Sequence, residues 1–298
     1  MVILEDLEEI CTKTKDQEDG NMLKKGSIIL LSIIIIPIIV LLILSLYKKN
    51  DETYDCKIYF FNAGKADAIL ISKNDKYIMI DTGEESLSDE ILRYFETNNI
   101  KRLEYLIITH FDKDHVGSAS SIIDNIEIGE VLQSNYPKDS VYYTNYLASL
   151  AAKSITPTTV SGLYSMIVED INISVNGPEI TFDNNESNNS SLIVSITNGN
   201  NKFLFMGDAE NARIKDFLSN NNETYDFIKI PYHGNYLKQL DNLLESTKPQ
   251  YGVMTCSSKE GCEEQTLEQL TNYNVKYYMT SKGAISIMSN GEDIIIKQ

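Results

Sequence analysis

Four side chains of types that bind metal ions occur within six residues: His110, Asp112, Asp114 and His115. They follow the apolar run 105–108, which is typical of a strand, and a turn at the end of a strand can direct several side chains to one point. Imidazole and carboxylate ligands suit Zn, Mn or Fe, and the carboxylates favour Mn more than an all-histidine site would. The spacing therefore predicts a metal site, and the alternative is a charged turn with incidental histidines.

Three further residues of ligand type follow other apolar runs. Asp208 comes after KFLFMG, His233 after FIKIPY, and Asp81 after YIMI. Each has a simpler interpretation: Asp208 as a turn residue or helix cap, His233 as a surface histidine, and Asp81 as an acceptor within its own turn. The ordered set favours a shared site instead, in which Asp81 orients the ligands rather than binding the ion.

The elements around these residues alternate between strand and helix patterns. Strands are expected at 57–63, 68–73, 77–81, 105–109, 192–197, 202–206, 227–230, 251–255 and 284–288. Helices are expected at 88–98, 210–218, 237–244 and 266–273, and loops at the Asn- and Ser-rich segments 183–191 and 219–224. This interleaving predicts an α/β layered fold.

Hydropathy divides the chain into a short acidic tail (1–25), a transmembrane helix (26–48) and a domain (51–298). Residues 27–47 carry no charge, and their number matches the ~20 residues that a helix needs to cross ~30 Å of hydrocarbon. A cleaved signal peptide and a buried soluble helix are the alternatives. The apolar run is longer than a usual signal-peptide core, and no A-x-A-like site follows it.

Lysines flank the predicted span almost equally, so the positive-inside rule decides little about its orientation. The short amino-terminal tail favours a cytoplasmic start and an extracytoplasmic domain. Cys256 and Cys262 could form a small disulfide in that compartment, and metal ligation by Cys262 is the other interpretation. We therefore predict a single-pass protein of the cell membrane that contacts lipid through 27–47.

The composition excludes several classes of protein. With 42% apolar and 23% charged residues, the chain is neither disordered nor collagen-like. The formal net charge of −17 repels phosphate backbones at long range, which argues against a protein that coats nucleic acid. A localised nucleic-acid site remains compatible with this charge.

Six motifs in order resemble the metallo-β-lactamase superfamily, and within it the hydrolase domain of ComEC-type competence proteins. They are FFNAGKADAILI (60–71), IDTG (80–83), ITHFDKDHVGS (108–118), NNSSLIVSI (188–196), FLFMGDAE (203–210) and IKIPYHGN (228–235). The resemblance implies an αββα sandwich, in which two β-sheets lie face to face with helices outside and a metal centre at one edge of the sheets.

By position, the resemblance assigns His110 and Asp112 to one metal half-site, and Asp208 to a bridge between half-sites. The other half-site would contain Asp114, His115 and His233. One or two divalent ions, Zn or Mn, are implied. The superfamily often has another histidine before the bridging residue, but 116–207 contains none, so a single-metal enzyme is also compatible with this sequence.

Two departures from the relatives concern the substrate. Their Gly-Gln-Gly-Asp turn is here GKAD (64–67), which places Lys65 beside the expected groove, either as a contact for an anionic substrate or as a solvated lysine. Their Gly-His-Pro near the end of the domain is here GCE (261–263). A histidine that contacts substrate or takes part in catalysis in the relatives would therefore be missing.

The resemblance implies a hydrolase that acts through a metal-bound hydroxide, with Asp114 orienting the nucleophile or accepting its proton. Phosphodiester cleavage, including nuclease action on single-stranded DNA, is the favoured reaction. A small ester, lactone or amide is the alternative substrate, and a non-catalytic sensor or binding module is the alternative class. A role in competence would require membrane partner proteins, because the sequence shows no set of DNA-channel spans.

Overall fold

The computed structural model describes residues 35–40, 54–179 and 187–298. The chain divides into Met1–Thr53 and a compact unit, Tyr54–Gln298. In the first unit residues 35–40 are helical; the predicted tail 1–25 and the rest of the predicted span 26–48 lie outside the described residues. None of the helices in these described ranges is long and apolar enough to cross a membrane.

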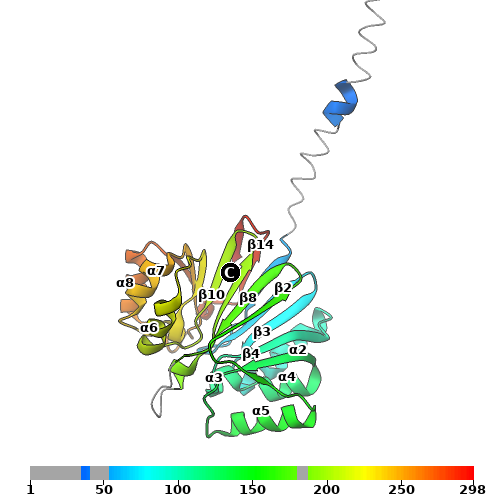
Figure 1. Ribbon diagram of the computed structural model, residues 1–298, viewed down its shortest axis with the longest axis vertical. Helices are drawn as coiled ribbons and strands as arrows, with labels where there is room; N and C mark the ends of the chain where they lie inside the picture. Colours follow the sequence, from blue (N-terminus) through cyan, green and yellow to red (C-terminus); the bar gives the residue numbers. More distant parts are fainter. Residues whose placement is uncertain (1–34, 41–53, 180–186) are drawn as a thin grey trace, which may run out of the picture. The chain divides into compact units, whose positions relative to one another are not determined.

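Two sheets form the centre of the unit Tyr54–Gln298 (Figure 1). The first has eight strands in the order β15-β14-β1-β2-β3-β4-β5-β6. They are β1 Cys56–Phe60, β2 Ala68–Lys73, β3 Lys76–Thr82, β4 Arg102–Ile108, β5 Glu127–Gln133, β6 Thr158–Thr159, β14 Ile285–Ser289 and β15 Ile294–Lys297. Strands β3 to β6 pair in parallel, so their carboxyl ends lie at the same edge.

The second sheet has seven strands in the order β13-β12-β11-β10-β9-β8-β7. They are β7 Leu163–Val168, β8 Ile171–Asn176, β9 Ile193–Asn198, β10 Asn201–Phe205, β11 Phe227–Lys229, β12 Tyr251–Met254 and β13 Lys276–Met279. Strands β10 to β13 pair in parallel. Their carboxyl ends also share one edge.

Helices cover the outer face of each sheet. The α-helices are α2 Ser88–Thr97, α3 Lys113–Val116, α4 Ala119–Asn125, α5 Val141–Ala152, α6 Asn211–Asn220, α7 Leu240–Thr247 and α8 Glu264–Asn272. The short 3₁₀ turns are η1 Glu85–Leu87, η2 Asn188–Ser190, η3 Pro231–Gly234 and η4 Thr280–Lys282. Helices α2, α4 and α5 lie against the first sheet, and α6, α7 and α8 against the second (Figure 1). The unit therefore has four layers: helices, sheet, sheet, helices.

Alternation along the strands explains how the layers pack. Ile80 and Ile107 point between the sheets, where they join Phe60, Phe205 and Phe227 in one buried cluster. The residues that alternate with Ile80 and Ile107 along their strands point to the opposite face of the sheet and pack against the helices. Because both faces of each sheet are covered, the central strands are apolar at nearly every position.

The predicted α/β layering is confirmed, but several elements were not predicted: α4, α5, β5 to β8, β13 and β15. Strand β7 carries Leu163 and Ile167 on its exposed side, each 68% exposed, so its sequence lacks a clean apolar–polar alternation. Helix α5 likewise exposes Val141 and Leu147. Apolar residues on both faces of an element obscure the period from which it would be recognised.

Candidate metal centre

The ligand-type residues meet where the carboxyl ends of the parallel strands face one another. Asp81 lies at the end of β3 and His115 in α3, just after β4, while Asp208 follows β10 and His233 follows β11. Asp81 and His233 both have positive φ, 53° and 55° respectively. Such backbone conformations are uncommon for residues other than glycine and occur often at functional sites.

Asp81 fixes the orientation of the His115 ring. The buried carboxylate of Asp81 accepts hydrogen bonds from the Thr109 backbone N–H (2.7 Å), the Thr109 hydroxyl (2.6 Å) and His115 Nδ1 (2.8 Å). Because Nδ1 of His115 donates its hydrogen to Asp81, the lone pair of the neutral ring lies on Nε2. Asp81 thus holds the His115 ring in place, and its carboxylate is fully buried.

Thr255 and Asp67 hold His233 in the matching orientation. His233 Nδ1 lies 2.9 Å from Thr255 Oγ1, and the Thr255 hydroxyl donates to Asp67 Oδ1 at 2.6 Å. Since the only hydroxyl hydrogen of Thr255 goes to Asp67, its oxygen accepts the hydrogen of His233 Nδ1. The lone pair of the neutral His233 ring is therefore also on Nε2.

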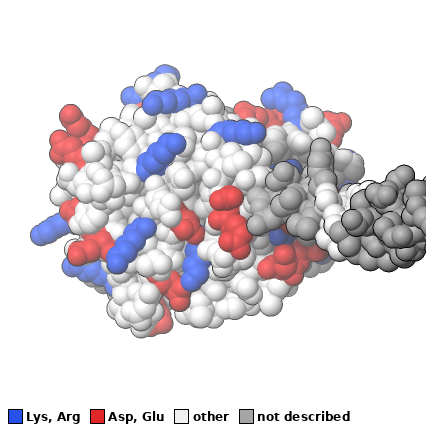
Figure 2. Space-filling model, turned by 90° about the horizontal axis from the view of Figure 1, so that it is seen from above, with Lys and Arg blue, Asp and Glu red and all other residues white. Residues whose placement is uncertain are grey.

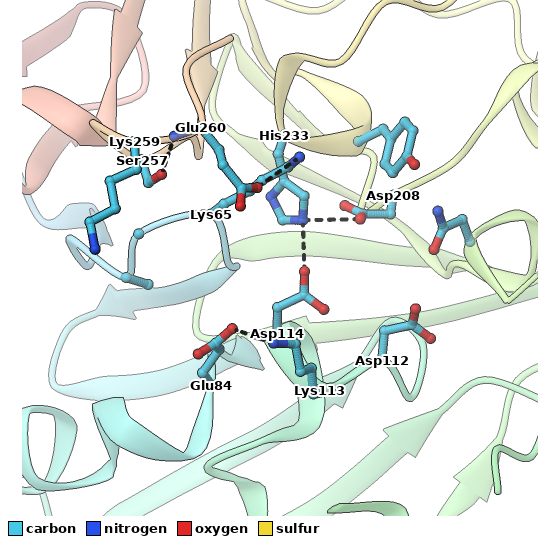
Figure 3. A pocket seen from close by; sticks show the side chains of 14 residues that line it. Lys65, Glu84, Asp112, Lys113, Asp114, Asp208, His233, Ser257, Lys259 and Glu260 are labelled. Carbon is cyan, nitrogen blue, oxygen red and sulfur yellow. Dashed lines mark hydrogen bonds and ion pairs between the residues drawn. The ribbon is translucent and has the colours of Figure 1, made fainter. Parts of the chain in front are cut away.

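Two imidazole nitrogens and two carboxylates come close together at this place. Figure 3 shows three of these side chains, His233, Asp208 and Asp114. His115 Nε2 and His233 Nε2 lie 3.3 Å apart. Asp208 Oδ2 is 3.3 Å from the former and 3.0 Å from the latter, and Asp114 Oδ2 is 3.4 Å from His233 Nε2. In a tetrahedral site with ligands at about 2.1 Å, neighbouring ligand atoms stand about 3.4 Å apart. The atoms of His115, His233 and Asp208 are therefore spaced to hold a divalent metal ion, and Asp114 lies beside His233.

Asp67 also lies close to this group, since ligand atoms of Asp67, His115, Asp208 and His233 all come within 4.8 Å of one another. Its carboxylate is already bound by Lys229 Nζ at 2.5 Å and by the Thr255 hydroxyl. The Asp67 carboxylate therefore holds His233 and Lys229 in place, and Asp114 Oδ2 lies next to His233 at the cavity.

Without a metal ion the carboxylates attract protons to the two imidazoles. Burial lowers the pKa of His233, but Asp208, Asp114 and Asp67 outweigh it and raise the pKa to about 10. Burial likewise opposes protonation of His115, and Asp208 and Asp81 nevertheless hold its pKa well above the usual value. A metal ion must therefore displace these protons when it binds.

His110 and Asp112 lie beside this group. The His110 ring centroid is 4.0 Å from that of His115, and His110 Nδ1 contacts the hydroxyls of Thr109 and Ser191. Its Nε2 is buried and has no hydrogen-bond partner, and burial, with nearby His115, lowers its pKa to about 4. The Asp112 carboxylate has hydrogen-bond partners other than His110. Its Oδ1 accepts hydrogen bonds from Lys138 and Ser187.

Three of these side chains, Asp114, Asp208 and His233, line a cavity of about 590 Å³. Lys65 lines this cavity and pairs with Glu260 at 3.5 Å, so the predicted substrate lysine has a carboxylate partner (Figure 3). Lys259, another lining residue, lies in the loop that the Cys256–Cys262 disulfide closes. Because Cys262 is in this disulfide, its thiolate is not available as a metal ligand.

Several supporting residues were not predicted: Thr109, Lys138, Ser187, Ser191, Arg213, Lys229 and Thr255. Two of them had a signal in the sequence, since Lys229 and Arg213 are charged residues at otherwise apolar positions, and both are fully buried. Arg213 donates from Nε to the Ser191 carbonyl at 3.0 Å, while the Ser191 hydroxyl accepts from the Asp208 backbone N–H at 3.2 Å. A buried cation needs several acceptors, so such a position marks a polar network.

The arrangement matches one known family. A family model described as the metallo-beta-lactamase superfamily matches residues 62–257. The chain belongs to this superfamily. The αββα sandwich that the motifs implied is thus confirmed for the metallo-β-lactamase domain.

Curated relatives of this superfamily domain support the narrower resemblance. The domain is 28% identical over 202 residues to "Recombination protein 2" of Haemophilus influenzae. The aligned residues make up 65% of this chain and 23% of that protein. It is 22% identical over 206 residues to "ComE operon protein 3" of Bacillus subtilis, with 66% and 26% covered. The chain therefore spans about a quarter of the length of these relatives, and the similarity to ComEC-type proteins is confirmed.

Among solved structures, the metallo-beta-lactamase fold protein YhfI from Bacillus subtilis superposes with a TM-score of 0.54. The match covers 82% of this chain and all of YhfI, at 9% sequence identity. At this identity the likeness concerns the fold alone.

Proposed function

We propose that the protein is a metal-dependent phosphodiesterase that cleaves single-stranded DNA. The observation that carries this proposal is the convergence of His115 Nε2, His233 Nε2, Asp208 Oδ2 and Asp114 Oδ2 at an open cavity. A divalent ion held there would activate a water molecule and stabilise negative charge that develops on the substrate.

Asp114 lies beside the histidines that would bind the metal ion and also faces the cavity in which the substrate would bind. It lines the cavity, and its side chain is 24% exposed, whereas His115 and His233 are almost fully buried. Burial raises the pKa of Asp114, but His233 and His115 lower it to about 2. An ionised carboxylate at this place can orient the attacking water or accept its proton.

Three lysines at the cavity support an anionic substrate: Lys65, Lys113 and Lys259. Lys65 and Lys113 pair with Glu260 and Glu84, at 3.5 and 3.1 Å, and these exposed pairs can exchange a carboxylate for a phosphate at little cost. Basic and acidic side chains are interspersed on the face in Figure 2. We therefore propose that phosphate is recognised in the cavity, at these three lysines.

The relatives support the choice of DNA as the substrate, since one of them is named a recombination protein. Small esters, lactones and amides are the competing substrates, because the same centre can polarise their carbonyl groups. A non-catalytic binding module is the competing class. Both alternatives predict no cleavage of DNA, and they differ in whether the protein turns over an ester.

The test is cleavage of end-labelled single-stranded DNA by the purified full-length chain, with Mn or Zn supplied. We expect cleavage that requires the metal and falls by roughly 10²-fold or more in Asp114→Asn. Asp89→Asn is the matched control, because Asp89 is an exposed carboxylate in the first turn of α2. No cleavage by folded, metal-loaded protein, or equal cleavage by both variants, would refute the nuclease.

We also propose that residues 27–47 anchor the protein in the cell membrane, with the domain outside the cytoplasm. The uncharged run supports the anchor, and the Cys256–Cys262 disulfide supports an oxidising compartment. Membrane partner proteins would deliver DNA to the domain. Protease added to intact cells should digest the domain, whereas protection of the domain until lysis would contradict the orientation.

A further inference from the structure

Asp112, a predicted metal ligand, has a lysine on its carboxylate. Asp112 Oδ1 accepts hydrogen bonds from Lys138 Nζ and from the hydroxyl of Ser187. Lys138 lies between β5 and α5, and Ser187 immediately precedes η2. Residues from two distant parts of the chain thus neutralise and fix one oxygen of this carboxylate.

The other ligands available to a metal beside His110 are few. His110 Nε2 and Asp208 Oδ1 are both buried without hydrogen-bond partners. They are the two atoms that could bind an ion here, although Lys229 Nζ lies 3.5 Å from Asp208 Oδ1. The hydroxyl of Ser191 does not supply a further ligand. It accepts a hydrogen bond from the Asp208 backbone N–H and contacts Nδ1 of His110, on the opposite side of the ring from Nε2. The half-site depends on Asp112 for a third ligand.

Positive charge is concentrated on this half-site and not on the other. Lys138 binds Asp112, and Lys229 Nζ lies 3.5 Å from Asp208 Oδ1, the oxygen that does not contact the histidines. Among the described residues, no salt bridge joins Asp114 to a lysine or arginine; His233 is its ion-pair partner. A divalent ion at His110 would therefore share both of its carboxylates with ammonium groups, whose positive charge repels the ion. Lys229 is fully buried and Lys138 is one-third exposed.

We propose that Lys138 sets the number of tightly bound metal ions at one. This inference rests on the proposed metal site formed by Asp114, His115, Asp208 and His233. The half-site of His110 and Asp112 binds a second ion only weakly, because the ion competes with the ammonium group of Lys138 for Asp112. Lys138 thereby takes the place of a second metal ion as the counter-charge of that carboxylate.

The experiment measures metal content and affinity rather than activity. The full-length chain in mild detergent is loaded with Zn or Mn, dialysed against metal-free buffer and analysed by mass spectrometry of the metal, and calorimetric titration follows the weaker site. We expect one retained equivalent in the wild type. Lys138→Met should bind a second ion at least tenfold more tightly, and the added substitution Asp112→Asn should abolish that gain.

Lys113→Met is the matched control, since Lys113 lines the cavity and, like Lys138, pairs with a carboxylate, but that carboxylate is Glu84 and not a predicted metal ligand. It should leave the second affinity unchanged. Two tightly retained ions in the wild type, or equal second affinities in Lys138→Met and Lys113→Met, would overturn the role of Lys138. A wild type that retains no metal would instead refute the proposed metal site. Lys138 is one-third exposed, so its replacement should not prevent folding.

Discussion

His115 Nε2 and His233 Nε2 lie 3.3 Å apart, each presented by a ring whose Nδ1 is bound on the opposite side. Two neutral nitrogens at this distance would each direct a lone pair at the other, which is unfavourable unless a cation or a proton lies between them. The pair of tautomers is imposed by Asp81 and Thr255, so these two residues determine how well the histidines bind a metal.

Asp81→Asn should weaken metal binding by roughly 10- to 100-fold. The amide of asparagine can donate to His115 Nδ1, which favours the tautomer that carries its hydrogen on Nε2, where the metal would bind. Calorimetric titration with Zn measures the loss. Asp124→Asn, at an exposed position in α4, is the control, and an unchanged affinity in Asp81→Asn would show that the tautomer is irrelevant.

Thr255→Val should lower both metal affinity and stability. The substitution keeps the shape but removes the hydroxyl between His233 and Asp67, and an unpaired buried polar group costs about 1–3 kcal/mol. Denaturant titration and metal titration measure the two effects. Thr271→Val removes an exposed hydroxyl that only bonds the Leu267 carbonyl. If Thr255→Val and Thr271→Val change stability and metal affinity equally, the hydroxyl between His233 and Asp67 has no special role.

The metal-free protein should lose stability as the pH rises from about 7 to about 10. The folded pKa of His233 is raised from 6.5 to about 10, and that of His115 is also raised. Stabilisation from a raised pKa is complete below the unfolded value and disappears as the pH passes the folded value. Denaturant titrations between pH 6.5 and 10 measure it.

Metal-loaded protein should not show this decline, because the ion replaces the protons on both imidazoles. Its affinity for metal should instead rise with pH over the same range. Metal-free protein that becomes more stable towards pH 10 would contradict the assigned environment of the two histidines.

Replacing both Cys256 and Cys262 by serine should destabilise the protein by about 2 kcal/mol, since the disulfide closes only a short loop. Thermal unfolding measures this change. Cys56 provides an internal comparison, because burial raises the pKa of its thiol to about 12 and it forms no disulfide with any cysteine in the described part of the chain. Native protein alkylated at Cys256 without a reductant would contradict the disulfide.

Much of the fold follows from the sequence because both sheets are covered on two faces. Strands such as β3 and β10 contain short continuous apolar runs, YIMI and FLF, which are followed by polar turn residues, and this pattern is typical of a buried strand. The edge strand β7 exposes apolar side chains, and its pattern is ambiguous for that reason. The pairing order of the strands depends on contacts that no local pattern contains.

The ligand-type residues were visible from their spacing, but their partners were not. His115 and His233 are 118 positions apart, and only folding shows that their Nε2 atoms meet. The sequence did not indicate that Lys138 binds Asp112, because a lysine in a polar loop is typical of a solvated surface. Residue type thus indicates which side chains can bind a metal, whereas their protonation and counter-charges depend on the tertiary structure.

The most direct test of the metal centre is anomalous X-ray diffraction from crystals of the full-length chain loaded with Zn or Mn. We expect one strong anomalous peak in contact with Nε2 of both His115 and His233, with Asp208 and Asp114 completing the ligands. A peak bound through Asp67 or Nδ1, or no peak between the two histidines, would contradict this expectation.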